Sequence, residues 1–384
     1  MKLENLTNFM EDLTSKRNYP GNAVKIYHDH SLIYEHSSGY ADIDSKQPFE
    51  TSTLVNLYST TKIITCACAM TLFEKGKFLM TDNIEKYIPE FRNMNVREKD
   101  ENGNEILRPA KCPITIRDLF SMTAGLDYNG NSPSLVNERK NNPDGSTLDY
   151  VRAIAKEPLT FDPGKRWQYS LCHDVLGGLI EALSDMPFAD YAEKVIFDKC
   201  GMKNTGFRRN DEIYAKMASQ YKYDSETHVP VQVPKENSHI FGKNYFSGGA
   251  GIYSNVDDYI LFADALACGG VAATGERILS NASIDLMRTN CLNQEQMKYF
   301  NWVTYRGYGY GYGVRTLIDR GIGGALSPIG EFGWGGAAGT LALIDPSNKL
   351  SVFYSMHMLN PQEEYNFPRL RNIVYAELSD ILNK

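Results

Sequence analysis

Apolar residues follow two different spacings along the chain, and each spacing predicts a different kind of element. The N-terminal segment carries apolar residues at helical spacing: Leu3, Leu6, Phe9, Met10 and Leu13. This pattern predicts a helix whose apolar face docks on the body of the protein. The next segment, residues 23–39, reads AVKIYHDHSLIYEHSSG and predicts two short strands around a turn at Asp29-His30.

The segment from Ser59 to Lys75 is apolar on nearly all sides, which predicts a central, buried helix that Gly76 terminates. Further helices are predicted at residues 115–122 and 174–183. Alternating patterns return from about residue 305 and predict strands, with a turn at 345–348 between two of them. A last amphipathic helix is predicted at 369–382.

This order of elements predicts the fold class. Strands near both ends of the chain most simply join one antiparallel sheet. We therefore expect an α/β (α+β) fold, in which helices flank an antiparallel sheet and a second lobe is mostly helical. Residues 1–78 and 245–384 are expected to form the sheet lobe and residues 79–244 the helical lobe, with an active site between the two.

Charge and cysteine content narrow the possible partners and location. The net charge is −7 and no stretch concentrates lysine and arginine, so no nucleic-acid surface is expected. No apolar run reaches the roughly 20 residues that cross a bilayer, and the N-terminal segment lacks the pattern of a secretion signal. The seven cysteines are scattered, which is typical of reduced thiols. We therefore expect a cytoplasmic protein without a membrane partner, and the sequence does not indicate an oligomeric state.

Ser59 and Lys62 carry the clearest candidate chemistry. They begin the buried helix in VNLYSTTKIITCACAM, and residues three apart on a helix share one face. A serine hydroxyl is a weak nucleophile that needs a base within hydrogen-bond reach. Burial and the positive end of the helix dipole both favour the neutral, proton-accepting form of a lysine. The pair therefore predicts an activated serine nucleophile.

The tetrapeptide alone has a simpler interpretation, in which Ser59 caps the helix and Lys62 is solvated. The run that Lys62 begins has no polar face, however, so a lysine there needs a reason to be buried. The commoner hydrolase signatures, GxSxG and HExxH, do not occur in the sequence.

The chain resembles the penicillin-recognising serine hydrolases, which comprise class C-type β-lactamases, D-alanyl carboxypeptidases and related esterases. The SxxK signature is typical of this group. The resemblance extends over nearly the whole chain, through segments that include GYADIDSKQPFETSTLVNLYSTTK, TIRDLFSMTAGL, PGKRWQYSLCHDVLGGLIEALS, GGAGIYSNVDDYILFADAL and EFGWGGAAGT. It implies a β-lactamase/transpeptidase-like fold and an acyl-enzyme mechanism without a metal or organic cofactor.

The resemblance also assigns residues, position by position. It implies that Ser59 is the nucleophile, that Lys62 is its partner, and that Tyr169 shares or relays the proton. Lysine and tyrosine form a coupled pair, so either Lys62 or Tyr169 could be the general base. The family's third motif, which lines the substrate site, falls on Trp334-Gly335-Gly336. The implied oxyanion hole consists of the backbone N–H groups of Ser59 and Ala337.

Two departures from the family pattern bear on the substrate. Leu171 stands where class C enzymes have an asparagine, and Trp334 replaces a lysine or histidine that can bind a carboxylate. Both favour a small neutral ester, acted on by a carboxylesterase or, as a variant, an acyltransferase. The alternatives are a β-lactamase or D-alanyl/D-amino-acid peptidase and, in another class, an inactive binding module of the same fold.

Other polar residues are interpreted as structural. Adjacent residues on a helix point in different directions, so Cys172-His173-Asp174 is not expected to form a triad but to make local hydrogen bonds. His28, His30 and His36 lie on the predicted hairpin without a carboxylate or cysteine at ligand spacing, so no metal site is expected there. Arg315 is expected to pair in solvent, and no role is assigned to Glu331.

Overall fold

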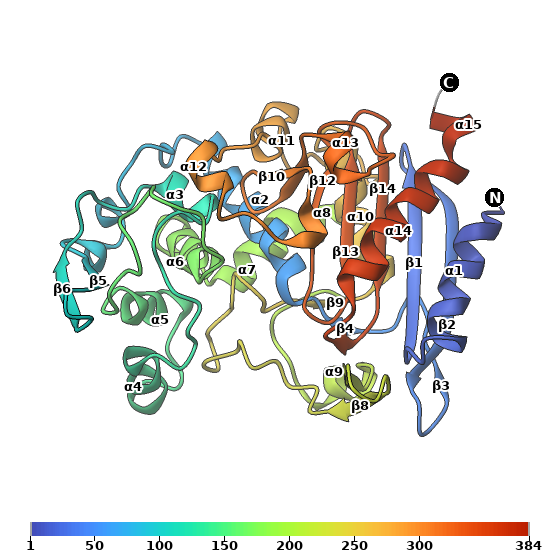
Figure 1. Ribbon diagram of the computed structural model, residues 1–384, viewed down its shortest axis with the longest axis horizontal. Helices are drawn as coiled ribbons and strands as arrows, with labels where there is room; N and C mark the ends of the chain where they lie inside the picture. Colours follow the sequence, from blue (N-terminus) through green and yellow to red (C-terminus); the bar gives the residue numbers. More distant parts are fainter. Residues whose placement is uncertain (1, 383–384) are drawn as a thin grey trace.

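An antiparallel sheet of eight strands forms the centre of the computed structural model, which describes residues 2–382 (Figure 1). The strands follow one another across the sheet in the order β10 (Tyr308–Tyr310), β11 (Arg315–Leu317), β12 (Phe332–Gly335), β13 (Leu341–Asp345), β14 (Leu350–Ser355), β1 (Gly21–His28), β2 (Ser31–Asp42) and β3 (Gln47–Pro48). Strands β1 and β14 pair antiparallel, which joins the two ends of the chain in one sheet. The predicted fold class is thereby confirmed.

Both faces of the sheet are covered by helices. Strand β14 is buried throughout, and its alternate residues enter two different hydrophobic clusters. On one face, Val352 packs in a cluster with residues of α1 (Glu4–Ser15) and α14 (Glu363–Glu377). On the other face, the Phe353 ring stacks at 4.1 Å on Tyr259 of α10 (Val256–Ala267). This two-sided burial explains why the strand carries large apolar residues on both faces.

The predicted central helix is present as α2 (Thr61–Glu74), preceded by a short 3₁₀ turn, η1 (Tyr58–Thr60). It contacts β12 on one side and α6 (Cys172–Ser184) and α7 (Phe188–Ala192) on the other. Helix α2 therefore lies between the sheet and the helices of the middle of the chain (Figure 1). Gly76 follows its end with a φ of +67°, the left-handed conformation that favours glycine after a helix.

Helices dominate the middle of the chain. They are α3 (Ile116–Phe120), α4 (Pro133–Asn141), α5 (Thr147–Ile154), α6, α7, the π-helical turn η4 (Glu193–Phe197), α8 (Asp198–Cys200) and α9 (Asp211–Lys216). Two hairpins accompany them, β5 (Asn95–Lys99) with β6 (Glu105–Pro109) and β7 (Gln220–Tyr223) with β8 (Pro230–Val233). The helical second part agrees with the predicted fold class, while the lobe boundaries at residues 78 and 245 stay a prediction.

The remaining elements complete the sheet's surroundings. They are β4 (Val55–Asn56), β9 (Tyr253–Ser254), α11 (Asn281–Met287), α12 (Gln294–Met297), α13 (Arg320–Gly323), β15 (Met358–Leu359), α15 (Ser379–Leu382) and the 3₁₀ turns η2 (Ile84–Lys86), η3 (Pro89–Phe91) and η5 (Val303–Tyr305). No helix within residues 2–382 combines the length and apolar character needed to span a membrane.

Two expectations from the sequence need correction. The last helix begins at Glu363, six residues earlier than predicted, because Pro368 lies inside it rather than at its start. Arg315 does not pair in solvent: its side chain is 4% exposed and donates to the fully buried Glu331 at 2.6 Å. The strand pattern concealed this pair because β11 and β12 bring the two residues together only when the sheet forms.

Candidate active site

Ser59 lies in the 3₁₀ turn that begins α2, directly after a residue with an unusual backbone. Tyr58 has a φ of +46°, a left-handed conformation that is costly for a bulky side chain. Its hydroxyl donates to Gln220 at 2.7 Å, and its ring is almost fully buried. These contacts hold the turn in place, and Ser59, half-buried, follows it at the start of the helix.

Lys62 is completely buried and turned towards Ser59. Its Nζ lies 3.3 Å from the Ser59 Oγ and donates to the Gly249 carbonyl oxygen at 2.7 Å. The predicted i, i+3 contact is therefore present, and the simpler interpretation of a solvated lysine does not describe the structure. No carboxylate of residues 2–382 forms an ion pair with Lys62.

Two tyrosine rings, not one, flank the Lys62 amine. The Nζ lies 4.5 Å from the centre of the Tyr169 ring and 5.6 Å from that of Tyr128. The two ring centres are 5.3 Å apart. Burial raises the pKa of the Tyr128 phenol well above its usual value, while the nearby Ser59 side chain opposes that rise. Sequence reasoning found Tyr169 and missed Tyr128, which follows the matched segment TIRDLFSMTAGL by two residues.

A buried carboxylate fixes the backbone that holds Lys62. Asp174 Oδ1 accepts hydrogen bonds from the Tyr245 hydroxyl and the Ser247 hydroxyl, both at 2.6 Å, and from the Gly249 N–H at 3.3 Å. The carbonyl of the same Gly249 accepts from Lys62. Asp174 thus positions Lys62 through the segment 245–249. The expectation of local bonding at the helix start is wrong for Asp174, because its partners lie more than seventy residues away in the sequence.

The end of β12 packs closely against the turn that holds Ser59. A Cβ added at Gly336 would lie 2.1 Å from Thr340 Oγ1 and 2.3 Å from the Leu57 carbonyl oxygen, so only glycine fits. Thr340 Oγ1 donates to the same Leu57 carbonyl at 3.0 Å and lies 3.1 Å from Thr60 Oγ1.

Ala337 follows Gly336 directly and is exposed. Its N–H has no hydrogen-bond partner among residues 2–382. The strand end that precedes this donor packs closely on the turn that holds Ser59.

Trp334 belongs to an aromatic cluster around Tyr169. Its side chain is 1% exposed, its indole N–H donates to the Tyr169 hydroxyl at 3.3 Å, and the two rings stack at 5.8 Å. Trp302 contacts both rings, at 5.3 Å from Tyr169 and 5.9 Å from Trp334, and is 37% exposed. Trp302, which the sequence did not single out, is therefore exposed, whereas Tyr169 is partly buried.

Two more residues complete the surroundings. Leu171 is buried and lines a small cavity with Leu126 and Ile154. His239, which sequence reasoning missed, places its ring 5.5 Å from Tyr128 and 6.0 Å from Tyr58. Burial and the nearby Lys62 charge lower the pKa of His239, so its imidazole stays neutral. No local sequence pattern connects His239 to the SxxK segment.

Cys172 and His173 do not join Ser59. His173 is fully buried, its Nε2 lies 3.7 Å from the Cys66 thiol, and burial lowers its pKa to about 3. Burial raises the pKa of Cys172 to about 12, which keeps the thiol protonated and inert. As predicted, these two residues and Asp174 do not form a triad.

Comparison with known proteins identifies the family. The chain belongs to the beta-lactamase family, whose model matches residues 6–375. It is 30% identical over 344 residues to Protein Rv1367c of Mycobacterium tuberculosis, covering 87% of this chain and 84% of that protein. It is 28% identical over 353 residues to esterase EstB of Burkholderia gladioli, covering 86% of this chain and 84% of that protein.

Solved structures share the same fold. Unliganded simvastatin synthase LovD from Aspergillus terreus, as its selenomethionyl derivative, superimposes with a TM-score of 0.83 at 21% identity, covering 98% of this chain and 99% of that one. EstCE1, described as a hydrolase with promiscuous acyltransferase activity, gives 0.78 at 24% identity, covering 97% and 98%. At these identities the likeness shows the fold alone. Together with the family, it confirms the predicted resemblance and defines the chain as an enzyme of the serine hydrolase class.

Proposed function

We propose that the protein hydrolyses small carboxylic esters through an acyl-enzyme formed on Ser59. The observation that carries this proposal is the fully buried Lys62 amine, held 3.3 Å from the Ser59 hydroxyl by the Gly249 carbonyl. A buried amine without a carboxylate partner beside a half-exposed serine is suited to accept and return a proton.

The reaction has two halves. In the first, the Ser59 proton moves to Lys62 or Tyr169 while Oγ attacks the ester carbonyl carbon. The oxyanion is stabilised by the N–H groups of Ser59 and Ala337. The tetrahedral intermediate then collapses, the bond to the leaving alcohol breaks, and the stored proton passes to the alcohol oxygen. In the second half, water gives its proton to the same group and attacks the acyl carbon. The bond between the acyl group and Ser59 Oγ then breaks, the proton returns to Oγ, and the acid is released.

The proposed substrate class rests on the side chains that we assign to the site from the sequence and the structure. Trp334 offers no cation for a carboxylate, and its indole N–H is already bonded to Tyr169. Leu171 has no amide to hydrogen-bond a peptide. The aromatic rings of Tyr128, Tyr169 and Trp302 favour an apolar acyl group over a charged one. The names of the relatives EstB and EstCE1 agree with ester hydrolysis, and acceptance of an alcohol in place of water would give acyl transfer.

Two competing functions, a peptidase or β-lactamase and an inactive binding module, can be distinguished from an esterase. The relatives also include a putative D-alanyl-D-alanine carboxypeptidase of Escherichia coli and Penicillin-binding protein 4* of Bacillus subtilis, whose names favour a peptidase or β-lactamase. A binding module that has lost activity would not need Lys62 beside Ser59. We also propose that the site lies between the two predicted lobes, and that the protein acts in the cytoplasm.

Parallel assays with p-nitrophenyl acetate, p-nitrophenyl butyrate and nitrocefin test the ester proposal. We expect turnover of both esters and negligible turnover of nitrocefin. Rapid hydrolysis of nitrocefin with neither ester consumed would overturn the proposal in favour of a β-lactamase. Failure of a fluorophosphonate probe to label the folded wild-type protein would favour the binding module.

A further inference from the structure

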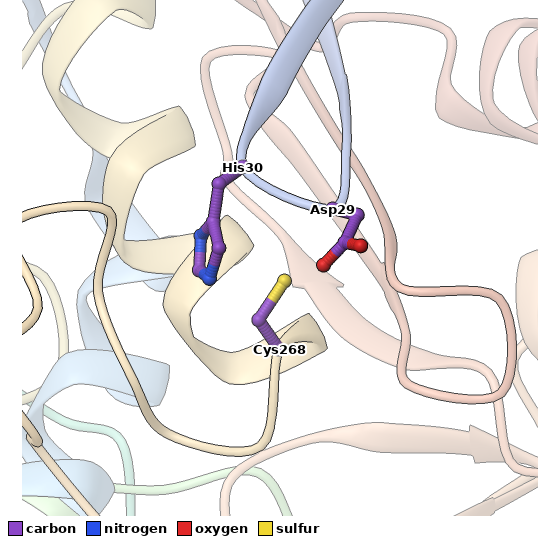
Figure 2. A group of neighbouring side chains, drawn as sticks. All are labelled: Asp29, His30 and Cys268. Atoms are coloured by element: carbon purple, nitrogen blue, oxygen red, sulfur yellow. The ribbon is translucent and has the colours of Figure 1, made fainter.

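Three side chains with different metal-binding atoms meet at the tip of the N-terminal hairpin. Asp29 and His30 form the turn between β1 and β2, and Cys268 follows the end of α10. One donor atom from each residue lies within 4.8 Å of the other two. The three side chains are turned towards one another (Figure 2). The sequence predicted no metal site on this hairpin because the cysteine is more than two hundred residues away.

The buried Asp264 carboxylate already orients the histidine. Asp264 Oδ2 lies 2.7 Å from His30 Nδ1, and its Oδ1 accepts from the His30 N–H at 3.2 Å. The Cys268 thiol contacts the same Oδ1 at 3.7 Å. The Asp264 side chain is 1% exposed, so this carboxylate is committed to these two residues.

This arrangement determines which imidazole nitrogen is available. With the proton on Nδ1 donated to Asp264, the lone pair is on Nε2. Histidines that bind zinc are commonly held in this way, with the other ring nitrogen donating to a carboxylate. The buried Asp264 is the observation, independent of the cluster itself, that points to a ligand.

From this geometry we propose that the protein binds a divalent transition-metal ion of the zinc type. The ligands would be His30 Nε2, the Cys268 thiolate and an Asp29 carboxylate oxygen, and a water molecule would complete the tetrahedron. Imidazole, thiolate and carboxylate are the ligands that zinc takes in proteins, whereas calcium and magnesium prefer oxygen alone. The ion would tie the hairpin to the end of α10 and would stabilise the folded state without taking part in catalysis.

Two features of the site disfavour metal binding. Lys349 Nζ pairs with Asp29 at 3.0 Å, but both side chains are more than half exposed, and exposed pairs contribute little. Burial, with the Asp264 charge second, raises the pKa of Cys268 to about 12, so the metal must displace the thiol proton. Binding should therefore release a proton, and replacing Lys349 should strengthen it.

Titration of the full-length, tag-free protein with Co²⁺ tests the site. Thiolate coordination to cobalt gives a charge-transfer absorption band, and we expect one that saturates at one equivalent and is displaced by Zn²⁺. Cys268→Ser should abolish the band, His30→Gln should weaken binding about 10-fold or more, and Lys349→Ala should strengthen it. Cys112→Ser, which removes an exposed free thiol elsewhere, is the matched control and should keep the band.

A wild-type protein without the band, or a band that persists in Cys268→Ser, would contradict the proposal. Zn²⁺ should also raise the melting temperature of the wild type and the Cys112→Ser variant but not that of Cys268→Ser. Equal shifts in all three would likewise count against a site at the hairpin. None of these readouts depends on esterase activity, so this test and that of the proposed function can fail separately.

Discussion

The Lys62 Nζ lies 2.7 Å from the carbonyl oxygen of Gly249, and this bond aims the lysine at Ser59. The carbonyl belongs to a segment that Asp174 holds from the start of α6. The position of the proposed base thus depends on two segments remote from it in the sequence. Several predictions about activity rest on this arrangement.

Removing the lysine should leave a folded but nearly inactive protein. We expect Lys62→Ala to lower kcat for p-nitrophenyl butyrate by about 10³-fold, because the Ser59 proton then lacks an acceptor. Circular dichroism should confirm the fold, and Lys75→Ala, at the exposed end of α2, is the matched control. A Lys62→Ala variant with nearly full kcat would show that another group takes the proton.

Tyr169 and Tyr128 should contribute unequally to kcat. The centre of the Tyr169 ring lies 4.5 Å from the Lys62 Nζ, and that of the Tyr128 ring lies 5.6 Å from it. The Tyr169 hydroxyl also accepts the Trp334 indole N–H. We expect Tyr169→Phe to lower kcat by about 10²-fold and Tyr128→Phe by about 10-fold. Steady-state kinetics on one ester compares them directly. A larger loss in Tyr128→Phe would transfer the proton-relay role to Tyr128.

Asp174 should act as a positioning residue. In Asp174→Asn an amide replaces the carboxylate that accepts three hydrogen bonds, so the segment 245–249 should shift and misplace Lys62. We expect kcat to fall by about 10²-fold with KM nearly unchanged, since Asp174 is buried and acts through the position of Lys62. A rise in KM at constant kcat would instead indicate a disturbed binding surface.

His357 should make stability depend on pH. Its Nδ1 donates to the Ala218 carbonyl and its Nε2 accepts the Asn56 N–H, and the second of these bonds requires a neutral ring. Burial lowers its pKa from an ordinary value of 6.5 to about 4. The unfolded chain therefore takes up this proton at a higher pH than the folded protein. The contribution of His357 to the free energy of unfolding should therefore fall by about 3 kcal/mol as pH drops from 6.5 to 4.

Urea unfolding at pH 7.5, 5.5 and 4.5 measures this dependence. The His357→Gln variant cannot take up the proton, so its decline between these pH values should be smaller than that of the wild type. Buried His173, with a pKa of about 3, should preserve part of the decline in both proteins. Identical slopes would show that His357 contributes nothing to it.

Local patterns were sufficient to predict the parts of the site that lie close together in sequence. Ser59 and Lys62 are three residues apart, and the apolar run after them indicated burial before any fold was known. The hairpin at Asp29-His30 and the turn at 345–348 follow from alternation and turn residues in the same way. The resemblance to a family placed Tyr169 and the segment 334–337.

Contacts between remote segments could not be predicted in this way. Asp174 looked like a helix-start residue, yet its partners come from residues 245–249. Arg315 was predicted to be solvated, but the pairing of β11 with β12 places it beside the buried Glu331. Trp302, His239 and Tyr128 carry no periodic signal, because their positions depend on packing across elements and not on spacing along one element.

Acylation of Ser59 is the central claim, and mass spectrometry after rapid mixing with p-nitrophenyl butyrate and acid quench tests it most directly. We predict a butyryl adduct on the wild-type protein that peptide mapping assigns to Ser59. Ser59→Ala should show no adduct and should lose at least about 10⁴-fold in kcat. An adduct on another residue, or undiminished turnover by folded Ser59→Ala, would contradict the account.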